Sequence, residues 1–304
     1  MNRDMLKEDR IHGNPMYPVS VYPDVEQLNG QSILDCHWHD EMEFILVTRG
    51  SAVFQIDMDY IEVHAGEALF VNSGEIHAGY LKDDPACIFS AVVFSPGFLS
   101  SHTFDSMQEK YLDPLFKKKL LPPMHITGKQ PWEQLVLNGL HTIIAVNEQE
   151  SPAFELITKA QLYAIFAAMY PFMQPAAKNN TRASASHDKV KRLKKALEYI
   201  HEHYSEAIKL RDLAAEVNMS EGHFCRFFKH LVQKSPVEYM NHYRILKASK
   251  LLENSDMKIV DVALEVGFDH LSYFITIFKK VNGITPSQYR KQFEEEVVTE
   301  VLHA

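Results

Sequence analysis

The sequence predicts an α+β protein of two domains, in which an N-terminal β-barrel with a helical hairpin precedes an all-α C-terminal domain. Three observations lead to this prediction: short β-branched or alternating runs early in the chain, a change to helical periodicity near Pro131, and an internal repeat in the last third. At 304 residues, 46% of them hydrophobic and 23% charged, the chain has enough apolar material for two separate cores.

The barrel is predicted over residues 1–130. Between residues 32 and 95, β-branched or alternating runs are separated by glycines at the spacing of a closed all-β barrel or jelly roll. The predicted strands include Glu43–Thr48, Val53–Asp57, Tyr60–Val63 and Ala68–Val71, and the punctuating glycines are Gly50, Gly66, Gly74 and Gly79.

Apolar residues at three- and four-residue spacing predict two amphipathic helices, Trp132–Asn147 and Ala153–Met173, which form a helical hairpin over residues 131–173. The apolar face of this hairpin either packs on its own barrel or pairs with a second subunit. Residues 174–187 are polar, aperiodic and rich in small side chains, which predicts an interdomain linker. The helical domain is expected over residues 188–293, and an acidic tail over residues 294–304.

Charge is distributed unevenly along the chain. The net charge of −9 divides into −10 for residues 1–187, +5 for residues 188–293 and −4 for the tail, so phosphate contact is expected in the helical domain. The three cysteines (Cys36, Cys87 and Cys225) lie far apart, which predicts a reducing cytoplasm and no disulfide framework. No apolar run approaches the roughly 18 residues of a membrane span, so no membrane contact is expected.

The internal repeat is the strongest indication of function. Asp212–Met219 (DLAAEVNM) returns 49 residues later as Asp261–Phe268 (DVALEVGF), and Ser235-Pro236-x-x-Tyr239 returns as Thr285-Pro286-x-x-Tyr289. Both copies have the parts of a helix-turn-helix: a small residue where the helices cross, a residue that tolerates the left-handed turn, and an N-cap. These parts are Ala214 and Ala263, Asn218 and Gly267, and Ser220 and Asp269. Two agreeing copies predict a double helix-turn-helix domain.

Residues of about 190–293, above all Gly267–Arg290 (GFDHLSYFITIFKKVNGITPSQYR), resemble the DNA-binding domain of the AraC family of bacterial transcription regulators. The resemblance implies two recognition helices, held by a long connecting helix near Val237–Glu253, that enter successive major-groove segments about one helical turn apart. It further implies double-stranded promoter DNA as a partner, RNA polymerase as a second partner if the protein is an activator, and a homodimer.

The resemblance also supplies the DNA-reading positions, by their numbers in this sequence. In the first recognition helix they are Gly222, His223, Cys225 and Arg226, and in the second they are His270, Leu271, Ser272, Ile275 and Thr276. Lys229, Lys279 and Lys280 are expected to contact phosphates.

Among the reading positions, Arg226 is the strongest candidate because an arginine can bind O6 and N7 of guanine together. A phosphate contact or a surface salt bridge is the alternative for this side chain. The sequence departs from the family pattern at Ile275 and Thr276. Because Leu271 and Ile275 suit thymine methyl groups, the second helix is expected to read weakly or to prefer A·T-rich DNA.

In the N-terminal half, His37-Trp38-His39-x3-Glu43 and a later His77 resemble the two motifs of the cupin barrels. Residues two apart on a strand face the same side, so His37, His39 and Glu43 are expected to converge, and His77 comes from a neighbouring strand. Departures from the cupin pattern occur at Asn72 and Leu81.

Three interpretations of this cluster stay open. In the AraC family, a cupin-like domain commonly binds a small organic effector, often a sugar, without metal. Three imidazoles and a carboxylate are also ligands for a divalent transition metal, which is the only cofactor considered. The third interpretation is that the histidines are core residues without a ligand.

The sequence therefore predicts a DNA-binding transcription regulator that is controlled by a small-molecule effector in a cupin-like barrel. No enzyme activity is expected. The alternative is a metal-dependent cupin enzyme of dioxygenase or isomerase type that carries a helical partner-binding domain.

Overall fold

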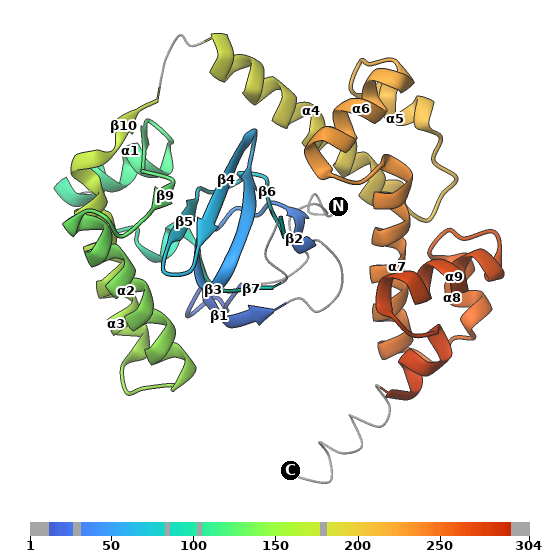
Figure 1. Ribbon diagram of the computed structural model, residues 1–304, viewed down its shortest axis with the longest axis horizontal. Helices are drawn as coiled ribbons and strands as arrows, with labels where there is room; N and C mark the ends of the chain where they lie inside the picture. Colours follow the sequence, from blue (N-terminus) through green and yellow to red (C-terminus); the bar gives the residue numbers. More distant parts are fainter. Residues whose placement is uncertain (1–11, 27–31, 83–85, 102–104, 177–180, 293–304) are drawn as a thin grey trace. The chain divides into compact units, whose positions relative to one another are not determined.

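The computed structural model describes residues 12–26, 32–82, 86–101, 105–176 and 181–292, with the side chains of the last range from residue 188 onward. The chain forms two compact units, residues 1–190 and 191–304 (Figure 1). The first unit is rich in β-structure and the second consists of helices, which confirms the predicted α+β class. Among the described residues, no helix is both long and apolar enough to cross a membrane.

The first unit is built around one long strand. β3 (Met42–Ile56) pairs through its first half with β5 and β7, and through its second half with β4 and β6, so it joins two layers of one eight-stranded sheet. The other strands of this unit are β1 (Val19–Glu26), β2 (Ser32–His37), β4 (Asp59–His64), β5 (Ala68–Val71), β6 (His77–Tyr80), β7 (Cys87–Phe94), β8 (Leu120–Leu121), β9 (His125–Ile126) and β10 (Gln174–Pro175).

β3 continues through Gly50, where the sequence suggested a turn between two strands. The φ angle of Gly50 is +72°, and a Cβ at this position would lie 2.1 Å from the carbonyl oxygen of Ala86. A glycine at position 50 therefore leaves room for the backbone that leads into β7, and it does not end the strand.

Alternation along β3 creates two apolar cores. Met42, Phe44 and Leu46 belong to the core that the helical hairpin shares, whereas Ile45 and Val47 belong to the core between the two sheet layers. Since side chains on a strand alternate between its faces, Glu43 shares the inner face of β3 with Ile45 and Val47. This register brings a carboxylate into the interior of the barrel.

The helical hairpin consists of α2 (Pro131–Glu148) and α3 (Phe154–Met169), which lie against one face of the sheet (Figure 1). Its buried apolar residues pack on the barrel of the same chain, which is the first of the two alternatives considered for this face. These residues are Val136, Leu140, Ile143, Leu162, Ile165, Phe166 and Met169. Short elements complete the unit: η1 (Pro96–Phe98), η2 (Gln108–Leu112), α1 (Asp113–Phe116) and η3 (Tyr170–Phe172).

The boundary between the two compact units falls within α4 (Thr181–His203). The helical unit contains the rest of this helix together with α5 (Leu210–Glu216), α6 (Glu221–Val232), α7 (Pro236–Asn254), α8 (Ile259–Glu265) and α9 (Leu271–Asn282). The repeat appears as two helix-turn-helix units, α5–α6 and α8–α9, with α7 between them. Asn218 and Gly267 adopt positive φ angles of 55° and 87°, as their places in the two turns require.

The prediction of a linker over residues 174–187 needs a correction. α4 begins at Thr181, inside the predicted linker, and Gln174–Pro175 form β10, which pairs with β8. Arginine and alanine at positions 182, 183 and 185 favour helix, and a helix that packing stabilises after residue 188 extends backward at little cost. The predicted acidic tail, residues 294–304, lies outside the described residues.

Candidate functional site

Four side chains converge inside the barrel, from three strands and the connection between two of them. His37 is the last residue of β2 and His77 is the first residue of β6, and the two are paired in register. His39 follows in the connection to β3, so it does not share a strand with His37 as expected, yet it joins the same cluster. Glu43 comes from the inner face of β3. The sequence-predicted set is therefore brought together as a whole.

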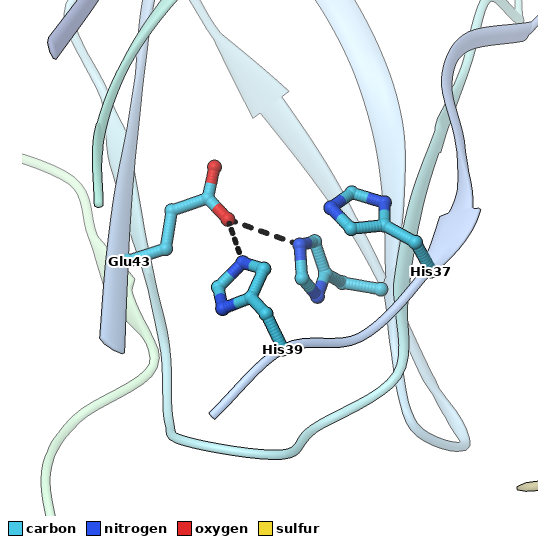
Figure 2. Close-up of side chains that lie close together, drawn as sticks. His37, His39 and Glu43 are labelled. Atoms are coloured by element: carbon cyan, nitrogen blue, oxygen red, sulfur yellow. Dashed lines mark hydrogen bonds and ion pairs between the residues drawn. The ribbon is translucent and has the colours of Figure 1, made fainter. Parts of the chain in front are cut away.

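One potential ligand atom from each of these four residues lies within 4.8 Å of all the others. Oε2 of Glu43 is 3.0 Å from Nε2 of His39, as a dashed line in Figure 2 marks, and 3.0 Å from Nε2 of His77. The exposed fractions of His39, Glu43 and His77 are 2%, 3% and 1%. Only His37 retains partial exposure, so the cluster is almost completely shielded from water.

The outer nitrogen of each imidazole is held by a backbone carbonyl. Nδ1 of the three rings lies 2.7, 3.2 and 3.0 Å from these oxygens. The pairs are His37 with Asp35, His39 with Glu41, and His77 with Glu75. Because a carbonyl oxygen only accepts, each Nδ1 carries its proton and donates it, and a neutral ring then directs the lone pair of Nε2 inward. Anchoring of this kind orients the histidine ligands of metal ions.

The carboxylate of Glu43 is ionised. Burial raises its pKa, but His77 and His39, when their rings carry a second proton, together outweigh burial through charge and hydrogen bonds, so the pKa lies far below the ordinary value. An anionic oxygen and the lone pairs of two imidazoles, 3.0 Å away, repel one another unless positive charge lies among them. Protons on the rings or a bound cation supply that charge, and the cluster therefore has the properties of a cation site.

Two neighbours of the cluster were not singled out from the sequence. His12 is 7% exposed, its ring centre lies 5.1 Å from that of His39, and its Nδ1 lies 2.9 Å from the hydroxyl of Tyr22. Burial raises the pKa of Glu75 to about 7, although Oε2 of Glu75 accepts the backbone N–H of Asn72. His12 lies outside both motifs and no periodicity marks it, so only the folded arrangement places it near the cluster.

The two recognition helices present the same pattern of exposure. In α6, Phe224 and Phe228 are buried, and in α9 the equivalent Phe274 and Phe278 are buried. Most predicted DNA-contact residues lie on the exposed sides: Gly222, His223, Arg226 and Lys229 around α6, and His270, Leu271, Ser272, Thr276, Lys279 and Lys280 around α9. Cys225 and Ile275, at equivalent positions of the repeat, are half-buried.

Details of α9 differ from the expectation. This helix begins at Leu271, so His270 occupies the N-cap position that was assigned to Asp269. The hydroxyl of Thr276 donates to the carbonyl oxygen of Ser272 at 2.9 Å, so its proton is used within the helix. Tyr273, which the sequence analysis did not select, is 47% exposed and its hydroxyl accepts a hydrogen bond from Asn241 at 2.9 Å.

Comparisons with known proteins agree with this organisation. A helix-turn-helix domain family matches residues 213–292, and the AraC-like ligand binding domain family matches residues 26–166. The chain is 32% identical over 286 residues to the uncharacterized HTH-type transcriptional regulator YdeC of Bacillus subtilis, covering 94% of this chain and 96% of the relative.

One further relative and one solved structure align with most of the chain. The HTH-type transcriptional activator RhaS of Escherichia coli is 24% identical over 260 residues, covering 84% of this chain and 87% of RhaS. The structure of ToxT from Vibrio cholerae aligns with a TM-score of 0.40 at 16% identity, over 90% of this chain and 97% of ToxT. With its two domain matches and a relative similar over nearly its whole length, the chain belongs to the AraC family of DNA-binding transcription regulators and carries an AraC-like ligand-binding domain before its helix-turn-helix domain.

Proposed function

We propose that α6 and α9 read promoter DNA while an effector bound at His37, His39, Glu43 and His77 sets the affinity for that DNA. The observation that supports the effector site is the convergence of four ligand atoms within 4.8 Å in the barrel interior. A ligand changes DNA affinity only if it binds two arrangements of the protein with different affinity. Occupancy of the cluster is the variable that selects between them.

A divalent transition metal ion takes part in this recognition. Three neutral imidazoles and one carboxylate suit iron, manganese, nickel or zinc, and the ionised Glu43 lies among nitrogen lone pairs whose direction the backbone fixes. When bound, the ion supplies the positive charge that these groups require and a point of attachment for an effector. His39, Glu43 and His77 hold it out of water, and the partly exposed His37 lies on the accessible side.

The barrel recognises its ligand without converting it. Support comes from the relatives that match this chain over most of their length, which are named as transcription regulators. Incubating the metal-loaded protein with a candidate effector and analysing the small molecule by mass spectrometry tests this point. Return of the unchanged molecule agrees with the proposal, and catalytic turnover would favour the cupin-enzyme alternative.

The protein acts in the cytoplasm, where bacterial promoter DNA lies, and as a homodimer. The outer face of the hairpin supports the dimer, because Leu135 and Leu156 are 63% and 71% exposed while the inner face packs on the barrel. RNA polymerase is the further partner if the protein activates transcription, as RhaS is named to do. Sedimentation of the wild type and of the double variant Leu135→Glu, Leu156→Glu tests the dimer, which the variant should not form.

A gel-shift titration tests DNA recognition. The full-length protein is titrated on the duplex upstream of its own coding region, with scrambled competitor, at two salt concentrations. The proposal expects a specific shift that salt weakens and that Arg226→Ala reduces. Arg211→Ala is the matched control, because Arg211 is an exposed cation on α5, outside both recognition helices. Equal binding to scrambled DNA would refute the proposal.

A further inference from the structure

Arg244, on the long helix α7, is a charged side chain that folding has largely removed from water. It is 8% exposed, its Nε donates to the carbonyl oxygen of Tyr204 at 2.7 Å, and its Nη2 donates to that of Glu206 at 2.8 Å. Its guanidinium carbon lies 5.6 Å from the centre of the Phe268 ring. Burying a cation is costly unless its donors are satisfied, so these contacts fix the position of the guanidinium.

The partners of Arg244 belong to different parts of the DNA-binding unit. Tyr204 and Glu206 lie in the connection from α4 to α5, directly before the first helix-turn-helix, whereas Phe268 lies in the turn of the second. α7 spans 19 residues, or about 28 Å at the helical rise, and joins the two helix-turn-helix motifs along the chain. Arg244 adds a direct connection between them that does not follow the chain.

The turn of the second helix-turn-helix packs against the same connection. A Cβ at Gly267 would lie 2.8 Å from the carbonyl oxygen of Tyr204, 2.9 Å from that of Ser205 and 3.0 Å from Nη2 of Arg244. The equivalent position in the first copy is Asn218, which also has a positive φ but carries an exposed side chain. Positive φ alone therefore does not require glycine in this repeat, and the close contact at the junction does.

A second contact ties the recognition helix itself to α7. One turn before Arg244, Asn241 donates to the hydroxyl of Tyr273 on α9 at 2.9 Å, and Asn241 is 7% exposed. Asn241 and Arg244, about one helical turn apart on α7, thus contact both the recognition helix and the turn of the second helix-turn-helix. Of these two residues, Arg244 alone also contacts the segment that precedes the first helix-turn-helix.

We infer that Arg244 is a positioning residue that sets the rotation and spacing of α9 relative to α6, and thereby the spacing of the two DNA segments that the protein accepts. The inference rests on the proposed reading of DNA by both helices. Adjacent base pairs differ by about 34° around the duplex, since one turn holds about 10.5 of them. A rigid junction therefore rejects a site whose two segments are one base pair closer or farther apart.

The test uses the full-length protein and a bipartite site obtained by in vitro selection. Fluorescence anisotropy measures binding to this duplex, to duplexes with one base pair inserted or removed between the segments, and to a duplex with the second segment scrambled. The wild type should lose about tenfold or more in affinity when the spacing changes, because base contacts of one helix are lost. Arg244→Ala should bind the three spacings within about twofold of one another while it keeps its affinity for the single segment.

Three variants separate positioning from stability. Ile245→Val removes a methyl group from the core that also contains Phe268 but leaves the hydrogen bonds of Arg244 in place, and it should keep the spacing preference of the wild type. Arg244→Lys retains the charge but lacks the fork of donors, so its preference should be intermediate. Gly267→Ala adds a methyl group that would clash with the backbone of Tyr204 and Ser205 and with Arg244, so it also opens the junction. This variant should lose the spacing preference, and it provides the test even if Arg244→Ala does not fold.

A folded Arg244→Ala protein, or a folded Gly267→Ala protein, that discriminates spacing like the wild type would overturn the role of Arg244 and leave the two-helix reading intact. A wild type that is itself indifferent to spacing would overturn both.

Discussion

Nε2 of His77 lies 3.0 Å from Oε2 of Glu43, and both side chains are at most 3% exposed. The other nitrogen of His77 is 3.0 Å from the carbonyl oxygen of Glu75, which fixes its proton there. An anion and a lone pair so close together, shielded from water, require positive charge, which a proton on the ring or a bound cation supplies. This relationship is the observation on which we propose a metal-dependent sensor.

Metal binding should stabilise the protein. A ligand that binds only the folded state adds about 2.7 kcal/mol at a free concentration of 100 times its Kd, so the thermal midpoint of chelator-treated protein should rise on adding zinc or manganese. Glu43→Gln should lose most of this rise, because an amide cannot neutralise the ion. Glu62→Gln, at an exposed carboxylate paired with Lys82, should respond like the wild type. An undiminished rise in Glu43→Gln would place the ion elsewhere.

Arg226→Ala should weaken operator binding by about 1–3 kcal/mol and relax the requirement at one base position, because a bidentate guanine contact is lost. Lys279→Ala should weaken binding to all sequences and reduce the salt slope by about one. Binding to a library of single-base operator variants at two salt concentrations distinguishes the two effects. Uniform loss across all bases in Arg226→Ala would show that Arg226 contacts phosphate.

Glu133 should make the stability of the first unit depend on pH. Burial raises the pKa of Glu133, but the backbone N–H groups of Gln130 and Thr127 outweigh it, so the pKa lies below the ordinary value of 4.5. A lowered folded-state pKa contributes stability above pH 4.5, and that stability is lost as the pH falls through the folded value. Glu133→Gln should cost about 1 kcal/mol at pH 7 and progressively less below pH 4.5.

Urea unfolding at pH 7 and at acidic pH measures this difference. Glu148→Gln, at the opposite end of α2, is the control and should cost nothing at either pH, because an acid near a helix C-terminus is not stabilising. A cost of Glu133→Gln that stays constant with pH would show that hydrogen-bond geometry alone, and not charge, matters at this position.

Gly79→Ala should destabilise the barrel by about 1–3 kcal/mol through overpacking. A Cβ at Gly79 would lie 2.9 Å from Cγ1 of Ile33 and 2.9 Å from Cε1 of Phe54, inside the core between the sheet layers. Gly97→Ala is the control, since its Cβ would meet only Ser95, at 3.4 Å. Equal unfolding free energies of the two variants in urea would contradict the packing of Gly79 described above.

Much of the fold follows from local patterns in the sequence. The repeat located both turns, at Asn218 and Gly267. The convergence of Glu43 with the histidines was also predicted, but the expected cause was wrong, because His37, His39 and Glu43 do not share one strand. The pairing of His37 with His77 depends on contacts between distant segments, and only the motif resemblance suggested it. Phe224 and Phe228 are four residues apart and both buried, so they lie on one face of α6 and leave the opposite face exposed.

Other features could not be predicted because their cause is tertiary. A glycine at position 50 suggests a turn, yet β3 continues through it. The glycine is needed there because the backbone of Ala86 comes too close for a side chain. The start of α4 at Thr181 depends on stabilisation by later residues, and the local composition is that of a linker. The junction at Arg244 joins segments about 40 residues apart, and no periodicity in the sequence marks such a contact.

The most direct test of the account measures DNA affinity with the barrel site empty and filled. Full-length wild type and Glu43→Gln are titrated on the specific duplex after chelation and again after reloading with metal. Reloading should change the DNA affinity of the wild type by about fivefold or more, the range of ordinary coupling between sites, and should leave that of Glu43→Gln unchanged. Specific binding of the wild type that is the same in both metal states would contradict control of DNA binding by metal occupancy of this cluster.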